Sequence, residues 1–537
     1  MTESPRITLI LDGRRFQVDK RRIIDKSRYF HSLFSHNFSD SKANEQTVLY
    51  NFDPIVIQDF CDWVEEDPPH ALHDESHQIK ISLQKYLSDS YLLLKQFVEL
   101  SIIYSVDELS VELSDIIVQH WLKPTHLLDI WRMSRELSLT ALTNVTFAAC
   151  LERFVEIPTD ELLSLPLVDF LKLAANININ CQQSYLLSVI DKRSQMVVDN
   201  REAQEKLARL QQLLRSLERQ AKTMQCFFVE TYKALNVREL HTKTIYAFHE
   251  GQSPRFSEVV EVWRVDDSGK DLAGVGLVGR GFSVYKIGGE LRLGSCKFNM
   301  NIWRYCLISR KWYYLARLRK ARRHMVAAIV DNKLILIGGV SRYRLKTNSV
   351  EVLDLHTSAW TRAPDIAESF TDTPPSCVID GVIIICISSL YMFNGHTNTW
   401  LSVKHDIDPV DFCSVRCLAC YKNTLFIGKE GGEFTDYSIA WTYAEDASIR
   451  AAFVIRSSFV YKSFHSACEK IHIDDRGKLS GIVYEAKKVI VESGTLGKDP
   501  HVKFSMHDFN FPGGGSLAPI SCFNLTDPAS LYMQVVE

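Results

Sequence analysis

The second half of the chain carries a repeated pattern that constrains the fold more than any other feature. An apolar run is closed by a glycine pair, and a tryptophan follows after an alternating run. Two copies lie about 50 residues apart, and a period of ~40–50 residues that carries four strands is typical of a β-propeller blade. The two copies contain Gly288, Gly289 and Trp312, and then Gly338, Gly339 and Trp360.

In a propeller blade, each of these residues has a structural task. A glycine pair lets the backbone turn tightly and approach its neighbours where a side chain would clash. The tryptophan fills the space between adjacent blades. We therefore expect the glycine pair to be structural and not a phosphate cradle.

Weaker copies of the pattern extend the repeat. The stretch 381–403 lacks the glycine pair but keeps Trp400, and a further unit ends at Trp441. From residue 236 to the end, short strand patterns and turn residues predominate, with hardly a helical candidate. This predicts an all-β propeller, with six blades as the expected number.

The first half of the chain has a different periodicity. Before residue 235, apolar residues recur at helical spacing, as in 92–118 and 206–224. The second stretch lasts under three heptads, so it favours a helix packed in a helical domain over a coiled coil. The beginning is the exception, because two alternating runs flank Asp12 and Gly13, which predicts a β-hairpin.

Composition limits the classes of protein and partner. Hydrophobic residues make up 46% and charged residues 24% of the chain, which is typical of a folded protein. The formal net charge of -3 is too small to imply nucleic acid or an acidic membrane as a partner. The 13 cysteines are odd in number and scattered, which suggests reduced thiols. We expect an intracellular protein, cytoplasmic with the nucleus as an alternative.

Motifs that could carry chemistry are weak. The stretch 274–279 reads GVGLVG, but a strand follows it where a dinucleotide site needs a helix. Cys417 and Cys420 have the spacing of two zinc ligands, but no second pair follows, which favours packing in a strand. The sequence contains no nucleophile elbow, His-Glu-x-x-His or Walker loop. We expect no catalytic residues, no metal and no cofactor.

Three stretches resemble known domains. Residues 322–364 resemble a kelch repeat, with Arg-His before an apolar strand closed by Gly-Gly, then VEVLDL and the tryptophan. FQVDKRRIIDKSRYFHSLF (16–34) resembles a BTB domain, and 122–157 with 159–180 resembles a BACK domain. In this order the chain resembles a divergent member of the BTB-BACK-kelch family. The resemblance implies an α/β BTB domain over 1–118, an all-α BACK domain over 119–235 and an all-β kelch propeller over 236–537.

The resemblance also implies a function. In this family the BTB domain forms a homodimer and binds cullin-3, and the propeller captures a protein for ubiquitination. The resemblance implies that the chain is a non-enzymatic adaptor and that Phe38 and Asp40 lie at the cullin contact. The family usually has glutamate at the position of Asp40, which keeps the charge but is one methylene shorter. The alternative is a cytoskeletal scaffold that cross-links actin through the dimer.

Two basic stretches, 317–325 and 340–346, are candidates for recognition of the captured protein, because loops on a rigid scaffold often carry binding residues. Guanidinium groups bind carboxylates bidentately, and tyrosine offers rigid contact area, so an acidic peptide segment is the expected ligand. Ordinary solvated loop charges are an equally good reading, and a nuclear localisation signal is a third. The candidate residues are Arg322, Arg323, Arg342, Tyr343 and Arg344.

Overall fold

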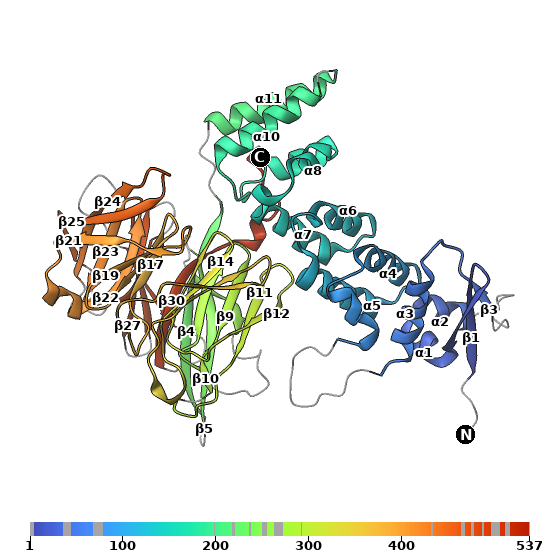
Figure 1. The fold of residues 1–537 in the computed structure, drawn as a ribbon, viewed down its shortest axis with the longest axis horizontal. Coiled ribbons are helices and arrows are strands. Elements are labelled where there is room, and N and C mark those ends of the chain that lie inside the picture. The colour runs from blue at the N-terminus through green and yellow to red at the C-terminus, as the bar shows by residue number, and fades with distance from the viewer. Residues whose placement is uncertain are drawn as a thin grey trace. The chain divides into compact units, whose positions relative to one another are not determined.

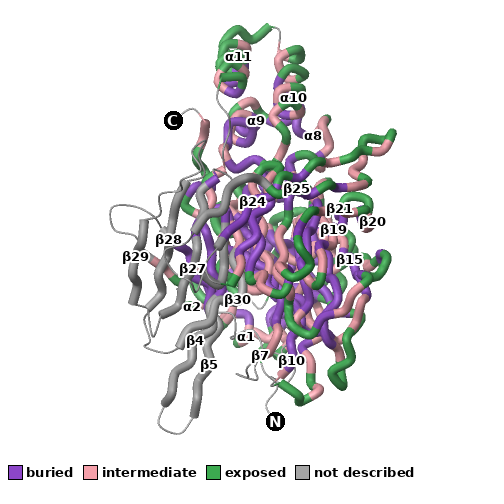
Figure 2. Tube along the Cα trace, turned by 90° about the vertical axis from the view of Figure 1, so that its left-hand side faces the viewer, coloured by how far each residue is buried: buried purple, intermediate pink, exposed green. Residues whose placement is uncertain are grey.

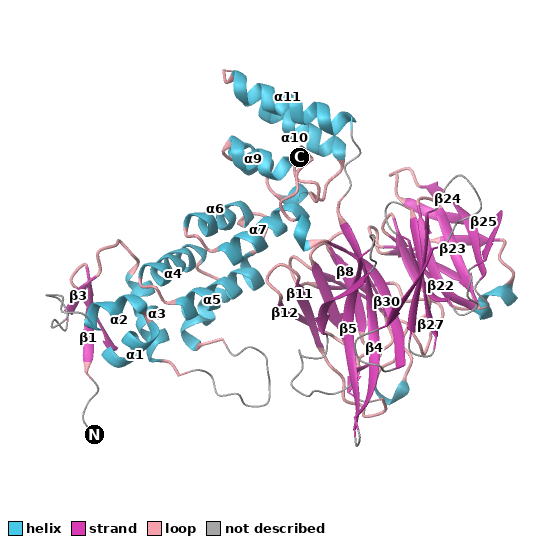
Figure 3. Ribbon diagram, turned by 180° about the vertical axis from the view of Figure 1, so that it is seen from behind, coloured by secondary structure: helices cyan, strands magenta, loops and turns pink. Residues whose placement is uncertain are grey.

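The computed structural model of the chain divides into two compact units. The first unit consists of Met1–Ala221 with Leu531–Glu537, and the second of Lys222–Ser530. Helices predominate in the first unit and strands in the second (Figure 3). No helix among the described residues is long and apolar enough to cross a membrane. The described residues are 5–35, 45–67, 79–197, 199–216, 221–235, 238–249, 255–261, 272–291, 293–430, 433–462, 468–473, 477–485, 488–495, 505–510 and 516–535.

The first unit, which we call the helical unit, opens with a hairpin of β1 (Arg6–Leu11) and β2 (Arg14–Asp19). Asp12 and Gly13 at its turn have φ values of 47° and 77°. A two-residue type I′ turn requires positive φ at both positions, which aspartate and glycine tolerate. The predicted hairpin is therefore confirmed. A third strand, β3 (Glu45–Thr47), pairs parallel to β1.

Helices make up the rest of this unit. The last of them packs against the helix before it and buries Leu207, Leu210 and Leu214, so the stretch forms a packed helix as predicted. In chain order (Figure 1) the helices are α1 (Lys20–Lys26), α2 (Arg28–Ser35), α3 (Pro54–Glu65), η2 (Ile81–Leu87), α4 (Tyr91–Ile103), α5 (Asp107–Ile116), η3 (Ile117–Trp121), α6 (Leu127–Glu136), α7 (Thr140–Glu152), η4 (Phe154–Glu156), α8 (Thr159–Ser164), α9 (Leu167–Ala174), α10 (Gln183–Met196) and α11 (Arg201–Ser216).

The end of the chain also belongs to the helical unit. The backbone of residues 531–535 makes hydrogen bonds with residues 175–177, of which Val535 N–H to Ala175 O is 2.7 Å long. The ring of Tyr532 stacks on that of Phe147, with centroids 4.9 Å apart. The chain therefore leaves this unit before β4 and returns to it after its last strand.

The second unit contains six sheets of four or five strands in the described part of the chain, which agrees with the expected six blades. The strands within each sheet are antiparallel, except that β21 joins blade 5 in parallel. We number the sheets as blades, with the innermost strand first. Blade 1 is β30 (Ser516–Thr526), β4 (Thr223–Leu235), β5 (Arg238–His249) and β6 (Arg255–Glu261); blade 2 is β8 (Gly276–Arg280), β9 (Ser283–Ile287), β11 (Asn301–Cys306) and β12 (Lys311–Arg317); blade 3 is β13 (Val326–Val330), β14 (Lys333–Ile337), β15 (Val350–Asp354) and β16 (Trp360–Ala363); blade 4 is β17 (Ser376–Ile379), β18 (Val382–Cys386), β19 (Leu390–Asn394) and β20 (Thr399–Trp400); blade 5 is β22 (Val415–Tyr421), β23 (Thr424–Lys429), β24 (Glu433–Tyr443), β25 (Ile449–Lys462) and β21 (Ser402–His405); blade 6 is β26 (Cys468–Ile473), β27 (Lys478–Glu485), β28 (Lys488–Thr495) and β29 (Ser505–Asn510).

The innermost strands form a ring. Contacts run from β30 to β8, from β8 to β13, from β17 to β22, from β22 to β26 and from β26 back to β30. β13 and β17 line one central cavity. Because β30 pairs with β4, the ring is closed by strands from the two ends of this unit. The unit is a β-propeller.

Blade 3 is covered on both faces by its neighbours, which explains its apolar runs in the sequence. In β14, Leu334 and Leu336 pack in the core between blades 2 and 3. Ile335 and Ile337 pack in the core between blades 3 and 4. A strand buried on both faces reads as a continuous apolar run rather than an alternating one. Buried residues accordingly run along the strands in Figure 2.

Two details of the predicted organisation are wrong. The helical range was expected to reach residue 235, but β4 begins at Thr223. Met224 fits the preceding helical spacing, yet its backbone pairs with Leu525 of β30, a partner that local periodicity cannot reveal. A repeat unit was expected to end at Trp441, but Trp441 lies on the third strand of blade 5. Trp312, Trp360 and Trp400 lie on the fourth strands of blades 2, 3 and 4.

Candidate partner-binding face of the propeller

The antiparallel order of each blade decides which loops share an end of the propeller. The connector that enters the innermost strand and the loop between the second and third strands both lie where the innermost strand begins. In blade 3, Arg323 of the connector and Val340 of the loop exchange two backbone hydrogen bonds of 2.9 Å. In blade 5, the N–H of Glu430 donates to the carbonyl of Ser414 at 2.8 Å. We call this end of the propeller the connector face.

The glycine pair of blade 3 packs its loop between two connectors. Gly338 and Gly339 have φ values of 61° and 101°, which favour glycine. A Cβ on Gly339 would lie 2.7 Å from the carbonyl oxygen of Arg323. A Cβ on Gly338 would lie 2.5 Å from the ring of Phe370, in the connector to blade 4. In blade 2, a Cβ on Gly288 would likewise meet backbone, 2.6 Å from Arg322 O.

Beyond the glycine pair, the loop of blade 3 makes an exposed turn. Tyr343 and Arg344 have φ values of 57° and 59°, and the tyrosine is 78% exposed. Non-glycine residues in this region carry strain, which is concentrated at binding sites and switches. The three cations of the turn are exposed and make no ion pair within the described residues. Arg342, Tyr343, Arg344, Leu345 and Lys346 form what we call the Tyr343 turn.

The neighbouring blades present the opposite charge on this face. Asp372 and Asp408 are exposed in the connectors to blades 4 and 5. Burial raises the pKa of Glu368, but hydrogen bonds from Ser388 and a neighbouring tyrosine, with the charge of Lys346, outweigh it and hold the pKa below its usual range. The sign of the charge therefore changes across the connector face, from the Tyr343 turn to an acidic rim.

Two of the predicted recognition residues are not available to a partner. Arg322 is fully buried, and its Nη2 lies 2.7 Å from Oε2 of Glu351. Arg323 is nearly buried, with Nε 3.0 Å from Oε2 of Glu290 in blade 2. Burial lowers the pKa of Arg322, partly offset by Glu351. The prediction that Arg322 and Arg323 bind a peptide is wrong, because the guanidinium group of Arg322 is paired inside blade 3 and that of Arg323 links blade 3 to blade 2.

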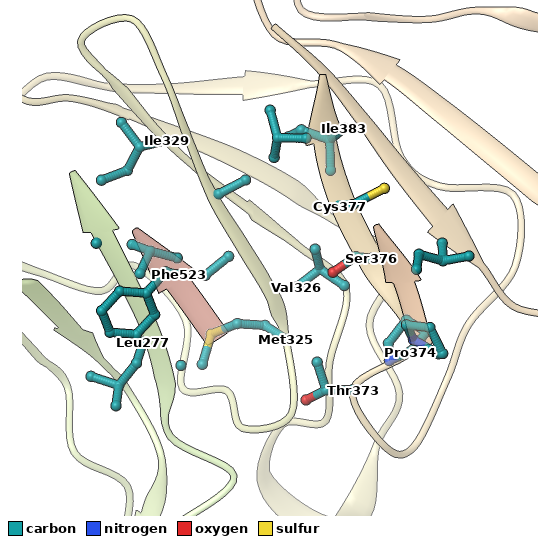
Figure 4. Close-up of a pocket in the computed structure, with 18 of the residues that line it drawn as sticks. Leu277, Met325, Val326, Ile329, Thr373, Pro374, Ser376, Cys377, Ile383 and Phe523 are labelled. Carbon is teal, nitrogen blue, oxygen red and sulfur yellow. The ribbon is translucent and has the colours of Figure 1, made fainter. Parts of the chain in front are cut away.

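The ring of innermost strands encloses a cavity of about 440 Å³. Strands from all six blades contribute to its wall. Figure 4 labels lining residues from blades 1 to 4. Leu277, Met325, Ile329 and Phe523 contribute apolar side chains to this wall. No group of three or more metal-ligating side chains occurs among the described residues.

The two motifs set aside in the sequence are parts of strands. Gly276 begins β8, and Gly279 packs so closely on β30 that a Cβ would lie 2.4 Å from the ring of Phe523. The pattern is therefore followed by a strand and not by a helix. Cys417 and Cys420 lie on β22, the innermost strand of blade 5.

Trp312, Trp360 and Trp400 lie on the outer strands of blades 2, 3 and 4. Trp400 donates from its ring N–H to the carbonyl of Pro364, which follows the outer strand of blade 3, at 2.8 Å. Trp360 packs against the core between blades 2 and 3. Trp312 lies against Tyr305 of its own blade, with ring centroids 5.1 Å apart. Phe38 and Asp40, the residues predicted to contact cullin-3, lie outside the described residues.

Comparison with known proteins identifies the repeat. Residues 321–366 match the kelch motif and span blade 3 from its connector to its outer strand. Two F-box/kelch-repeat proteins of Arabidopsis thaliana are similar to this chain. One is 27% identical over 135 residues, 25% of this chain and 34% of that protein; the other is 27% identical over 115 residues, 21% of this chain and 24% of that protein. The chain thus spans about a third and about a quarter of these relatives.

These matches make this a kelch-repeat protein whose propeller belongs to the class of protein-interaction domains. The kelch motif lies within the propeller, and the two matches leave most of each relative uncovered. The activity and partners of the whole chain are therefore taken up as proposals.

Sequence reasoning missed the apolar part of the connector face. Leu345 is 62% exposed beside the predicted Tyr343 and Arg344. Leu293, in the corresponding loop of blade 2, and Val410, in the connector to blade 5, are also exposed. The sequence signal that could have indicated this apolar surface is a leucine within a basic loop, because an apolar loop residue that fills no core can contact a partner.

Proposed function

We propose that this chain is a non-enzymatic adaptor that recruits a protein through the connector face of its propeller. The observation that carries the proposal is the Tyr343 turn. It presents a tyrosine, a leucine and three cations, none of which is used in the described core. Tyrosine and arginine are enriched among residues that dominate binding energy.

The chemistry of the turn favours an acidic peptide segment as the recruited element. A guanidinium group can donate two parallel hydrogen bonds to one carboxylate, and the apolar surfaces of Tyr343 and Leu345 would pack against the aliphatic parts of the segment. The acidic rim around Asp372 and Asp408 would repel an acidic segment that extends towards blades 4 and 5. We infer that the acidic part of the segment lies over blades 2 and 3.

The role of the helical unit in the proposal rests on its resemblance to BTB and BACK domains. It would form a homodimer and bind cullin-3 through Phe38 and Asp40, so that the recruited protein is ubiquitinated in the cytoplasm or nucleus. A buried aromatic such as Phe38 can contribute ~2 kcal/mol or more to binding. The confirmed hairpin with its parallel third strand supports this part of the proposal.

Peptide binding by the connector face can be tested with the full chain. Fluorescence anisotropy would measure binding of a Glu-rich peptide and of a Gln-substituted copy. We expect the Arg342→Glu/Arg344→Glu variant to lose at least about tenfold in affinity for the acidic peptide, equivalent to ~1.4 kcal/mol. The affinity should fall with added salt, because exposed charges are screened.

The matched control is Arg310→Glu, which reverses an exposed arginine at the opposite end of blade 2, between β11 and β12. Equal loss in both variants, or equal affinity for the two peptides, would rule out the Tyr343 turn as the site.

Cullin-3 binding needs a separate experiment. Calorimetric titration of the full chain with the cullin-3 N-terminal domain should show submicromolar binding that Phe38→Ala abolishes. No binding by a folded dimer, together with co-sedimentation with actin filaments, would favour the scaffold instead. The peptide experiment is independent of this outcome, because it reports on the propeller alone.

A further inference from the structure

The innermost strands of blades 4 and 5 bring two cysteines together. Sγ of Cys377 on β17 lies 2.9 Å from Sγ of Cys420 on β22. The two residues are 43 positions apart in the sequence, which is about one blade. Both line the central cavity and pack at the edge of the core between these blades.

We propose that Cys377 and Cys420 form a peroxide-sensitive disulfide that links blade 4 to blade 5. A disulfide requires sulfur atoms ~2.05 Å apart on neighbouring backbones, so the two sulfurs need to approach by about 0.9 Å. The Cα atoms of β17 and β22 already lie within the contact range of adjacent strands. Small rotations of the two side chains can supply this approach, while the strands stay in place.

The two thiols take different parts in the reaction. Burial, with the neighbouring Cys377, raises the pKa of Cys420 well above its usual value, which disfavours its thiolate. We assign the first attack to Cys377. Its thiolate attacks one oxygen of hydrogen peroxide, the O–O bond breaks, and the released hydroxide takes up a proton to give water and a sulfenic acid.

The sulfur of Cys420 then attacks the sulfur of the sulfenic acid. The S–O bond breaks, and the hydroxyl group leaves as water with the proton of the Cys420 thiol. Two thiols and one hydrogen peroxide thus give one disulfide and two waters, so that the sulfurs are oxidised and the peroxide oxygens are reduced.

The bond would hold together two blades that contact each other through side-chain packing and strand contacts. A cross-link over 43 residues restricts the unfolded chain and raises the melting temperature of the propeller, by about 6 °C for a domain of this size. The effect does not depend on the partner bound at the connector face.

The test uses the reduced full-length chain, treated with graded hydrogen peroxide. Remaining thiols are blocked with iodoacetamide, and a non-reducing tryptic digest is analysed by mass spectrometry. Trypsin leaves Cys377 with Cys386 in peptide 363–404 and Cys420 with Cys417 in peptide 417–422. Fragmentation spectra and the variants Cys386→Ser and Cys417→Ser therefore assign the linked pair.

We expect a linked peptide in the wild type and in both of these control variants, and none in Cys377→Ser or Cys420→Ser. Dithiothreitol should remove the link and reverse the rise in melting temperature. The inference is overturned if peroxide oxidises the exposed Cys413 while no linked peptide forms in the wild type. A link that survives Cys420→Ser would overturn it as well.

Discussion

Replacing Arg322 by methionine should destabilise the propeller by about 3–5 kcal/mol, because it removes one partner of a buried ion pair. The side chain of Arg322 is 0% exposed and that of Glu351 is 6% exposed. Nη2 also donates to Oγ of Ser349 at 3.1 Å, and Nη1 donates to the carbonyl of Gly338 at 3.3 Å. The variant leaves the carboxylate of Glu351 buried without its counterion. Glu351→Gln leaves the guanidinium buried in the same way and should have a similar effect.

The melting temperature gives the assay. An unfolding entropy of ~2.1 cal/mol/K per residue, over about 300 residues in Lys222–Ser530, converts this loss into a fall of about 5–8 °C in the calorimetric transition of the propeller. The double variant Arg322→Met/Glu351→Leu replaces both charges by apolar side chains. It should recover most of the loss, because such replacements are often neutral. The difference between the double variant and the sum of the single variants measures the coupling of the pair.

Two results would refute this reasoning. A fall of less than about 2 °C in both single variants would mean that the pair contributes little to the fold. A loss of acidic-peptide affinity in Arg322→Met at an unchanged melting temperature would assign Arg322 to binding, as the sequence had suggested. Arg344→Glu is the comparison for binding, because this side chain is exposed on the Tyr343 turn.

Two further predictions concern the backbone and pH. Gly339→Ala should lower the melting temperature of the propeller by about 3–6 °C, because φ is 101° and a Cβ would lie 2.7 Å from the carbonyl of Arg323. Gly294→Ala is the control, since φ is 86° but no atom lies within 4 Å, and a fall as large as in Gly339→Ala would contradict the steric explanation. In the helical unit, burial raises the pKa of Asp129, but hydrogen bonds, first among them that of Lys95, outweigh it and lower the pKa overall. The ionised Asp129 therefore stabilises the folded unit at pH values above its unfolded-state pKa of ~3.9, and this stabilisation is lost as the pH falls through its folded-state pKa. Asp129→Asn should therefore make the melting temperature of this unit fall less steeply at acidic pH.

The sequence could predict those parts of the fold that local chemistry decides. The hairpin at Asp12 and Gly13 follows from two residues that tolerate positive φ. The apolar run of β14 follows from burial on both faces of a blade. The start of β4 could not be predicted, because the partner of Met224 is Leu525, at the other end of the propeller.

The candidate site divides in the same way. Arg342, Tyr343 and Arg344 were identified because the sequence places them in a loop, and loops lie at the surface. Arg322 and Arg323 belong to the same basic pattern but are buried. Their counterions, Glu351 and Glu290, lie in two different blades, so only the packed ring shows that these charges are neutralised inside it.

The distribution of charge in blade 3 therefore separates stability from recognition. Two of the connector's arginines pair with buried carboxylates, Arg322 with Glu351 inside blade 3 and Arg323 with Glu290 of blade 2. The Tyr343 turn, which follows the glycine pair, places its cations where no carboxylate of the described core pairs with them. A substitution at Arg322 should then change stability before binding, and one at Arg344 should change binding before stability. A propeller can vary its ligand through such a loop without repacking the ring, because the side chains that hold the blades and those that meet a partner are different residues of one repeat.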